Sequence, residues 1–164
     1  VQTCALPISK KKSSSTKNLI FFIGLLCALL SVVLFLILDV FSISIPVLGD
    51  RLFTGIEFVF GCKTKYLDSE ILQFNYVALI TILLPVLGIL LSVLSKKNKL
   101  IGLVSSLFIL GGAVMMFILP SFASIGYSDV LSVLNLKGSL EIGGIIGGSL
   151  NIVAFLSVFY AKVI

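Results

Sequence analysis

The chain has 164 residues, of which 59% are hydrophobic and only 12% are charged, and its formal net charge is +5. Soluble domains carry about 25% charged residues, so this composition excludes an ordinary soluble protein and predicts an all-α integral membrane protein. The basic excess does not indicate nucleic-acid binding, because the lysines stand at the ends of apolar runs and not together on one soluble face.

The first 17 residues differ from the rest. Residues 1–8, VQTCALPI, resemble the translation of a sequencing-adapter oligonucleotide, and we expect them to be an artefact and not native sequence. Residues 9–17, SKKKSSSTK, are basic and polar with nothing apolar to bury, which predicts a disordered cytoplasmic tail. Residues 18–164 are predicted to form a single four-helix membrane domain.

Four apolar runs match the roughly 20 residues that a helix needs to cross a bilayer. The predicted spans are residues 18–40, 74–95, 100–120 and 140–161. Gly24, Ala28 and Ser31 give the first span a face that another helix can approach closely. Pro85 predicts a kink in the second span. Residues 96–99 are so few that the second and third spans must be antiparallel neighbours.

The fourth span opens with the most specific packing pattern in the chain. Gly143 and Gly147, and beside them Gly144 and Gly148, form two overlapping pairs at a spacing of four, which lets another backbone come close. Asn151 extends this stripe and is predicted to hydrogen-bond to a neighbouring helix. The stripe packs either against a helix of the same chain, the interpretation we favour, or against a second copy in a dimer.

The distribution of basic residues predicts the orientation. Eight lysines precede the first span, join the second to the third, or follow the fourth, whereas four basic residues are spread over the longer connections 41–73 and 121–139. By the positive-inside rule, both termini are cytoplasmic and these two connections lie outside. We therefore expect a multi-pass protein of the cell membrane, with the lipid bilayer as its constant partner.

The first outside connection is predicted to hold a β-hairpin or a three-stranded sheet. Residues 41–45 alternate between apolar and polar side chains, and the alternation in residues 56–60 puts Ile56, Phe58 and Phe60 on one face. Both patterns are typical of half-buried strands, and residues 63–67 are a weaker third candidate. In the second outside connection, helical spacing predicts a short surface helix over residues 129–138. The expected partner surface consists of Ile56, Phe58, Phe60 and Cys62, whose thiol either stays free or bridges to another protein.

The sequence offers little for catalysis. It contains no histidine, and none of its seven acidic residues lies in the middle of a predicted span. These absences remove His-based triads and metal sites and leave intramembrane acid–base chemistry without a residue to perform it. We expect no enzymatic activity, no cofactor and no metal.

The order of a short basic tail, one span, a longer outside connection and three closely spaced spans resembles the topology of claudin-like tetraspan proteins. Claudins carry a Trp-bearing signature and a cysteine pair in the first outside loop, whereas this chain has no Trp and only Cys62 there. That difference removes the junctional function of claudins. With eleven Lys against one Arg, the composition is also similar to that of small four-span membrane proteins of low-GC Gram-positive bacteria.

Two functions stay open. The first is a non-enzymatic component of the cell envelope that binds another membrane protein or a second copy through the outside connection and the fourth helix. The alternative is a small transporter or channel subunit with Pro85 and Asn151 in its path, which requires a polar route between the helices.

Overall fold

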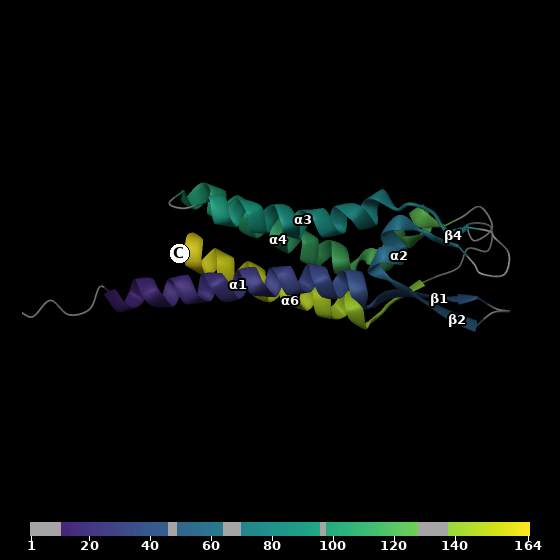
Figure 1. Cartoon of the computed structure of the whole chain (residues 1–164). Coiled ribbons are helices and arrows are strands. Elements are labelled where there is room, and N and C mark those ends of the chain that lie inside the picture. Colours follow the sequence, from purple (N-terminus) through teal and green to yellow (C-terminus); the bar gives the residue numbers. More distant parts are fainter. Residues whose placement is uncertain (1–10, 46–48, 64–69, 96–97, 128–137) are drawn as a thin grey trace, which may run out of the picture.

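The computed structural model describes residues 11–45, 49–63, 70–95, 98–127 and 138–164. Long helices lie side by side along the molecule, and short strands gather at one end (Figure 1). We call this the sheet end. The opposite end, where the first helix begins and the last one finishes, is the terminal end.

The four predicted spans are confirmed as helices apart from residues at their ends, among them residues 39–40 of the first span, 119–120 of the third and 140 of the fourth. They are α1 (Lys11–Ile37), α3 (Tyr76–Leu94), α4 (Lys99–Phe117) and α6 (Ile142–Lys162). Each contains a stretch that is long and apolar enough to cross a membrane, which indicates a multi-pass membrane protein. Asn75 and Asn98 set the starts of α3 and α4, because their side-chain oxygens accept hydrogen bonds from backbone N–H groups of the first turn.

The start of α1 differs from the prediction. The helix begins at Lys11, so the basic segment that was expected to be disordered is helical from that residue onward. The physical reason is cooperativity: once the apolar span is helical, each further residue adds a backbone hydrogen bond without a new nucleation step. Lysine is also a good helix former.

The helices pack in the order α1, α6, α4, α3, with the most extensive contacts between successive members of that series. First and last helices are therefore direct neighbours, while α1 and α3 contact each other less. An apolar groove of about 290 Å³ opens between α1 and α3. It is lined by Phe22, Leu25, Leu26, Leu29 and Ile89.

The main sheet has three antiparallel strands, with β1 (Asp39–Ile45) in the centre between β2 (Gly49–Thr54) and β5 (Gly138–Leu140). The strand predicted over residues 41–45 is confirmed. The third strand was expected from the first outside connection, but it comes from the second one. Lys63 pairs instead with Glu70 in a separate sheet of β3 (Cys62–Lys63) and β4 (Glu70–Leu72), and residues 64–67 lie outside the described chain.

The strand predicted over residues 56–60 is wrong, because this segment is the short helix α2 (Gly55–Phe60). Thr54 and Glu57 form a capping box: the Thr54 hydroxyl accepts from the Glu57 backbone N–H, and the Glu57 carboxylate accepts from the Thr54 backbone N–H. These two local bonds favour a helix start over an extended strand. Gly55 lies directly against the Phe35 carbonyl, where a larger residue would collide.

The sheet end is joined to the helices by an apolar core. Phe41 of β1 and Phe58 of α2 are both buried, with ring centroids 5.0 Å apart, and Phe35 of α1 belongs to the same cluster. After α4, the chain continues as the 3-10 helix η1 (Leu119–Gly126), whose Leu119 is buried in this core as well. The surface helix predicted over residues 129–138 falls on residues outside the described chain, except for Gly138, which begins β5.

Candidate functional site

The structure places all four glycines of the α6 stripe against other parts of the same chain, and all four are buried. A Cβ atom on Gly143 would lie 2.7 Å from the Asp39 carbonyl oxygen, and one on Gly148 would lie 2.7 Å from the Phe117 ring. Gly144 lies against the Leu140 side chain, and Gly147 lies against Met116 and the backbone of α1. The stripe therefore serves packing inside the bundle.

A buried polar cluster lies beside this stripe, where α1, α4 and α6 meet. The Ser31 hydroxyl donates a hydrogen bond of 2.7 Å to the Gly147 carbonyl oxygen, so the small face predicted on the first span contacts the glycine stripe. Asn151 Nδ2 lies 3.5 Å from Met116 Sδ, which is a weak acceptor. Within the described chain, Asn151 Oδ1 has no hydrogen-bond partner, although the residue is fully buried.

Pro85 of α3 also contacts α4, but it does so at Gly112, whereas Asn151 contacts α4 at Met116. A Cβ atom on Gly112 would lie 2.6 Å from Pro85 Cδ, and the Ser105 hydroxyl donates to the Gly88 carbonyl oxygen at 2.8 Å. The structure thus places Pro85 at the contact between α3 and α4, whereas Asn151 contacts Met116 from α6. The Ser105 hydroxyl is thus bonded to backbone, whereas the buried Ser92 hydroxyl of α3 has no hydrogen-bond partner among the described residues.

The expected partner surface on residues 56–62 divides into separate parts. Phe58 is only 1% exposed and belongs to the core, so it is removed from the surface, and Cys62 is half-buried. Ile56 and Phe60 are 50% and 63% exposed. The two exposed side chains are four residues apart on α2 and share one face of that helix. A strand would have grouped all three apolar residues on one face.

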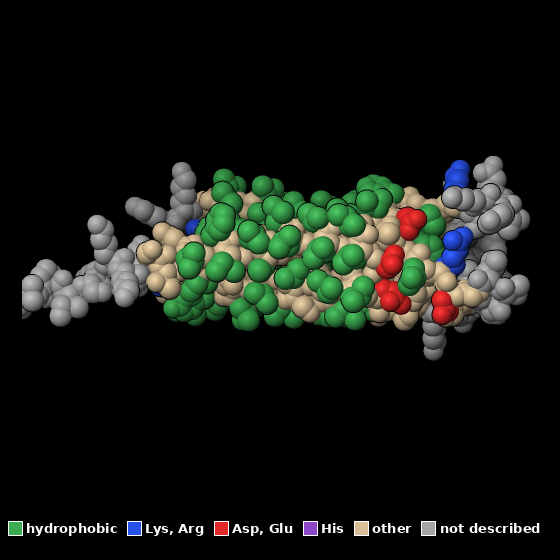
Figure 2. All heavy atoms as spheres, turned by 60° about the horizontal axis from the view of Figure 1, so that its bottom comes forward, with side chains coloured by type: hydrophobic (Ala, Val, Ile, Leu, Met, Phe, Trp, Pro, Cys, Tyr) green, Lys and Arg blue, Asp and Glu red, His purple; other side chains and the backbone are tan. Residues whose placement is uncertain are grey.

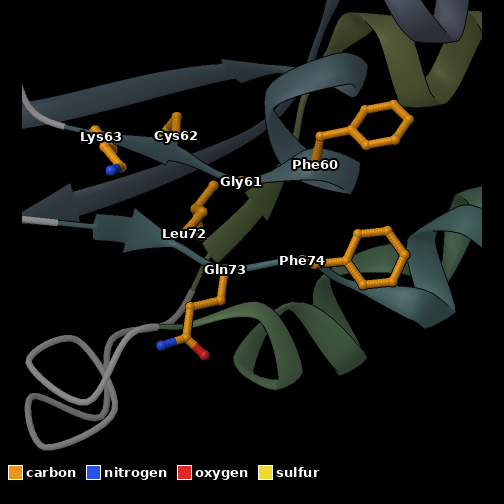
Figure 3. Close-up of a pocket in the computed structure, with 7 residues that line it drawn as sticks. All are labelled: Phe60, Gly61, Cys62, Lys63, Leu72, Gln73 and Phe74. Carbon is orange, nitrogen blue, oxygen red and sulfur yellow. The ribbon is translucent and has the colours of Figure 1, made fainter.

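A pocket of about 550 Å³ lies next to α2, and Figure 3 shows its lining. At its centre, Gly61 has φ +85° and lies directly against the Leu72 carbonyl, so the chain can turn from α2 into β3 only with glycine there. The lining residues are Phe60, Gly61, Cys62, Lys63, Leu72, Gln73 and Phe74.

Cys62 contributes a thiol to the lining of this pocket. Burial raises the pKa of its thiol above the usual value, and the negative charge of Glu57 raises it further. A hydrogen bond from the Leu72 backbone and the charge of Arg51 oppose this shift without cancelling it. At neutral pH the thiol therefore stays protonated and is a poor nucleophile.

The described residues bring no three His, Cys, Asp or Glu side chains into a group that could hold a metal ion. The sequence analysis missed the capping box, although Thr54 and Glu57 have the spacing of a helix start. Comparisons with known protein families, curated proteins and solved structures find no match, so the function is inferred from these residues and their contacts.

Proposed function

We propose that this chain is a non-enzymatic, multi-pass component of a cell envelope that binds another membrane protein or a second copy through its sheet end. One observation supports this most strongly: β1 pairs with both β2 and β5, so the sheet joins two connections that are far apart in the sequence. Burial of Phe41 and Phe58 fixes this sheet to the helices. The result is a single platform and not a pair of separate loops.

One edge of the platform is β2, which with β5 is an outer strand of the main sheet. Edge strands carry backbone N–H and C=O groups that a partner strand can use. Leu52 is 53% exposed on this strand, and the charged residues Asp50 and Arg51 precede it. Charges on an edge strand limit unspecific pairing, so a partner would have to match them.

The proposal places the sheet end outside the cell. The five described acidic residues, namely Asp39, Asp50, Glu57, Glu70 and Glu141, belong to elements of the sheet end, and Figure 2 shows acidic side chains along that border of the apolar band. Lys17, Lys99 and Lys162 stand at the opposite ends of α1, α4 and α6. Arg51 and Lys63 belong to the sheet end, so the support for a cytoplasmic terminal end is the distribution of basic residues over the whole sequence, eight against four.

Photocrosslinking in intact membranes tests the platform. A photoreactive residue at position 52 should give one defined adduct, whereas the same residue at position 90 serves as the matched control, because Leu90 is 55% exposed on the membrane-spanning helix α3. A protein that runs as a monomer in mild detergent and gives no adduct at position 52 contradicts the proposal.

A small transporter or channel subunit is the second candidate, and the unpartnered Oδ1 of Asn151 is the observation that favours it. The hydroxyls of Ser31 and Ser105 support it less, since both are bonded to backbone carbonyls. Asn151→Leu, measured in reconstituted vesicles, distinguishes a transport role of Asn151 from a packing role. Loss of solute flux in the variant favours transport. A changed stability of the variant, with no flux in the wild type, favours packing.

A further inference from the structure

We propose that α2 is an interfacial helix, whose Ile56 and Phe60 rest, together with Phe74, among the lipids of the leaflet at the sheet end. The inference rests on the four spans and does not depend on the proposed protein partner. It assigns lipid contact to Ile56 and Phe60, which the sequence predicted to be part of a protein-binding surface.

Helical geometry gives α2 three distinct sides. Successive residues are rotated by about 100°, so Gly55, Phe58 and Val59 share one side, and all three are buried against the core. Ile56 and Phe60 share a second side and are half or more exposed. Glu57 occupies the third and is bonded to Thr54. One apolar side thus remains uncovered beside one charged side, as in a helix that lies in a membrane surface.

The position of this apolar side relative to the bilayer follows from the length of α3. Its 19 residues span about 28 Å, slightly less than the roughly 30 Å of hydrocarbon in a bilayer. Groups just before Tyr76 therefore lie at the membrane boundary. Phe74 is one of them, and its ring centroid is 6.4 Å from that of Phe60. Figure 3 shows both rings pointing away from β3 and β4.

The apolar side of α2 also continues a lipid-facing surface. Tyr76, Ile80 and Leu83 follow one another at helical spacing along α3, with exposed fractions of 57%, 44% and 44%. Phe74 is 51% exposed and joins this stripe to Phe60. The three side chains Ile56, Phe60 and Phe74 are also too few for a stable protein interface, which buries more than about 1,000 Å². Lipid is the occupant that fits both observations.

The absence of tryptophan from the sequence makes a clean test possible. Single-tryptophan variants Ile56→Trp and Phe60→Trp of the full chain are reconstituted into phosphatidylcholine vesicles, with or without bromine on the upper part of the acyl chains. Leu52→Trp is the matched control on β2, since Leu52 is as exposed as Ile56. Ile80→Trp on α3 is the positive control for lipid contact.

We expect bromine to quench Ile56→Trp and Phe60→Trp several-fold more strongly than Leu52→Trp, with emission shifted to shorter wavelength. Quenching as weak as that of Leu52→Trp, with emission typical of water, overturns the proposal. A short-wavelength emission without quenching also overturns it, because the side chain is then covered by protein. Quenching of Ile80→Trp shows that bromine reports lipid contact in these vesicles, and a native thermal transition of each variant shows that it is folded.

Discussion

Gly143 shows most clearly how a single residue controls the packing of the bundle. A methyl group there would meet the Asp39 carbonyl oxygen at 2.7 Å and the Leu38 Cβ at 2.9 Å. Backbone atoms cannot move aside as a flexible side chain can, so Gly143→Ala should destabilise the protein by about 1–3 kcal/mol through overpacking. The measurement is the unfolding free energy in detergent.

Gly111→Ala on α4 is the matched control, because its added methyl group would make ordinary contact with Leu84 at 3.6 Å. Alanine favours a helix over glycine by about 1 kcal/mol, so this variant should be neutral or stabilised. Equal destabilisation of Gly143→Ala and Gly111→Ala would show that the close contact of Gly143 is not present in the protein.

Cys62 provides a test of local electrostatics. Its raised pKa means that alkylation, which requires the thiolate, should be slow at pH 7 and should accelerate as the pH rises toward the pKa. Glu57→Gln removes a negative charge that raises this pKa, so the variant should react faster than wild type at the same pH. Glutamine keeps the capping box.

This comparison uses chains in which the other cysteines are replaced by alanine, and the rate of maleimide modification is followed from pH 6.5 to 9. Because the pKa of Cys62 is raised above its usual value, the wild-type rate should still be rising at the upper end of this range and should stay below that of the variant. A rate that is unchanged by Glu57→Gln across the range contradicts the assigned role of Glu57.

At the scale of elements, the long apolar runs and the strand over residues 41–45 were predictable, whereas α2 and β5 were not. A span is specified by about 20 residues of similar character, whereas α2 is decided by two side-chain-to-backbone bonds between Thr54 and Glu57. The strand was predicted over residues 56–60 from the alternation of side chains alone, without considering this cap. β5 was not predictable from its own sequence, since Gly138–Leu140 is extended only by pairing with β1.

The pairing of β1 with β5 can be tested by an engineered disulfide. Ser42 and Ser139 are direct partners in the register, and their hydroxyl oxygens are 2.7 Å apart. Partner Cα atoms in antiparallel strands are about 4.5–5.5 Å apart, which suits a disulfide. Ser42→Cys combined with Ser139→Cys should therefore crosslink under mild oxidation, as seen by mass spectrometry of non-reduced peptides.

Ser44→Cys combined with Ser139→Cys is the control for register, because Ser44 lies two residues further along the same face of β1. Diagonal Cβ atoms at this offset are about 7–8 Å apart, so crosslinking should be much weaker. Equally efficient crosslinking of both pairs would mean that the register differs or that the strands are not fixed.

At the scale of the whole molecule, the number of spans and the contact between α3 and α4 were predictable, but the contact between α1 and α6 was not. Apolar length identifies each helix, but the contact between α1 and α6 depends on matched small residues, such as Gly24 against Ser157. Lysines join the helices at the terminal end. Lys162 Nζ lies 4.1 Å from the centre of the Phe21 ring, and Lys99 Nζ donates to the Val163 carbonyl oxygen at 3.0 Å. The same residues that predict orientation thus also hold helix ends together.

The orientation of the molecule yields the last prediction. Leu52→Cys at the sheet end and Ile164→Cys at the terminal end are suitable probes, because the two side chains are 53% and 65% exposed. In a background without the native cysteines, a membrane-impermeant maleimide should label Leu52→Cys in intact cells and Ile164→Cys only after permeabilisation. The expectation follows from the lysines at the terminal end, which the positive-inside rule keeps in the cytoplasm. The reverse pattern would place the platform inside the cell, and labelling of both positions in intact cells would show that the helices do not separate the two ends across a membrane.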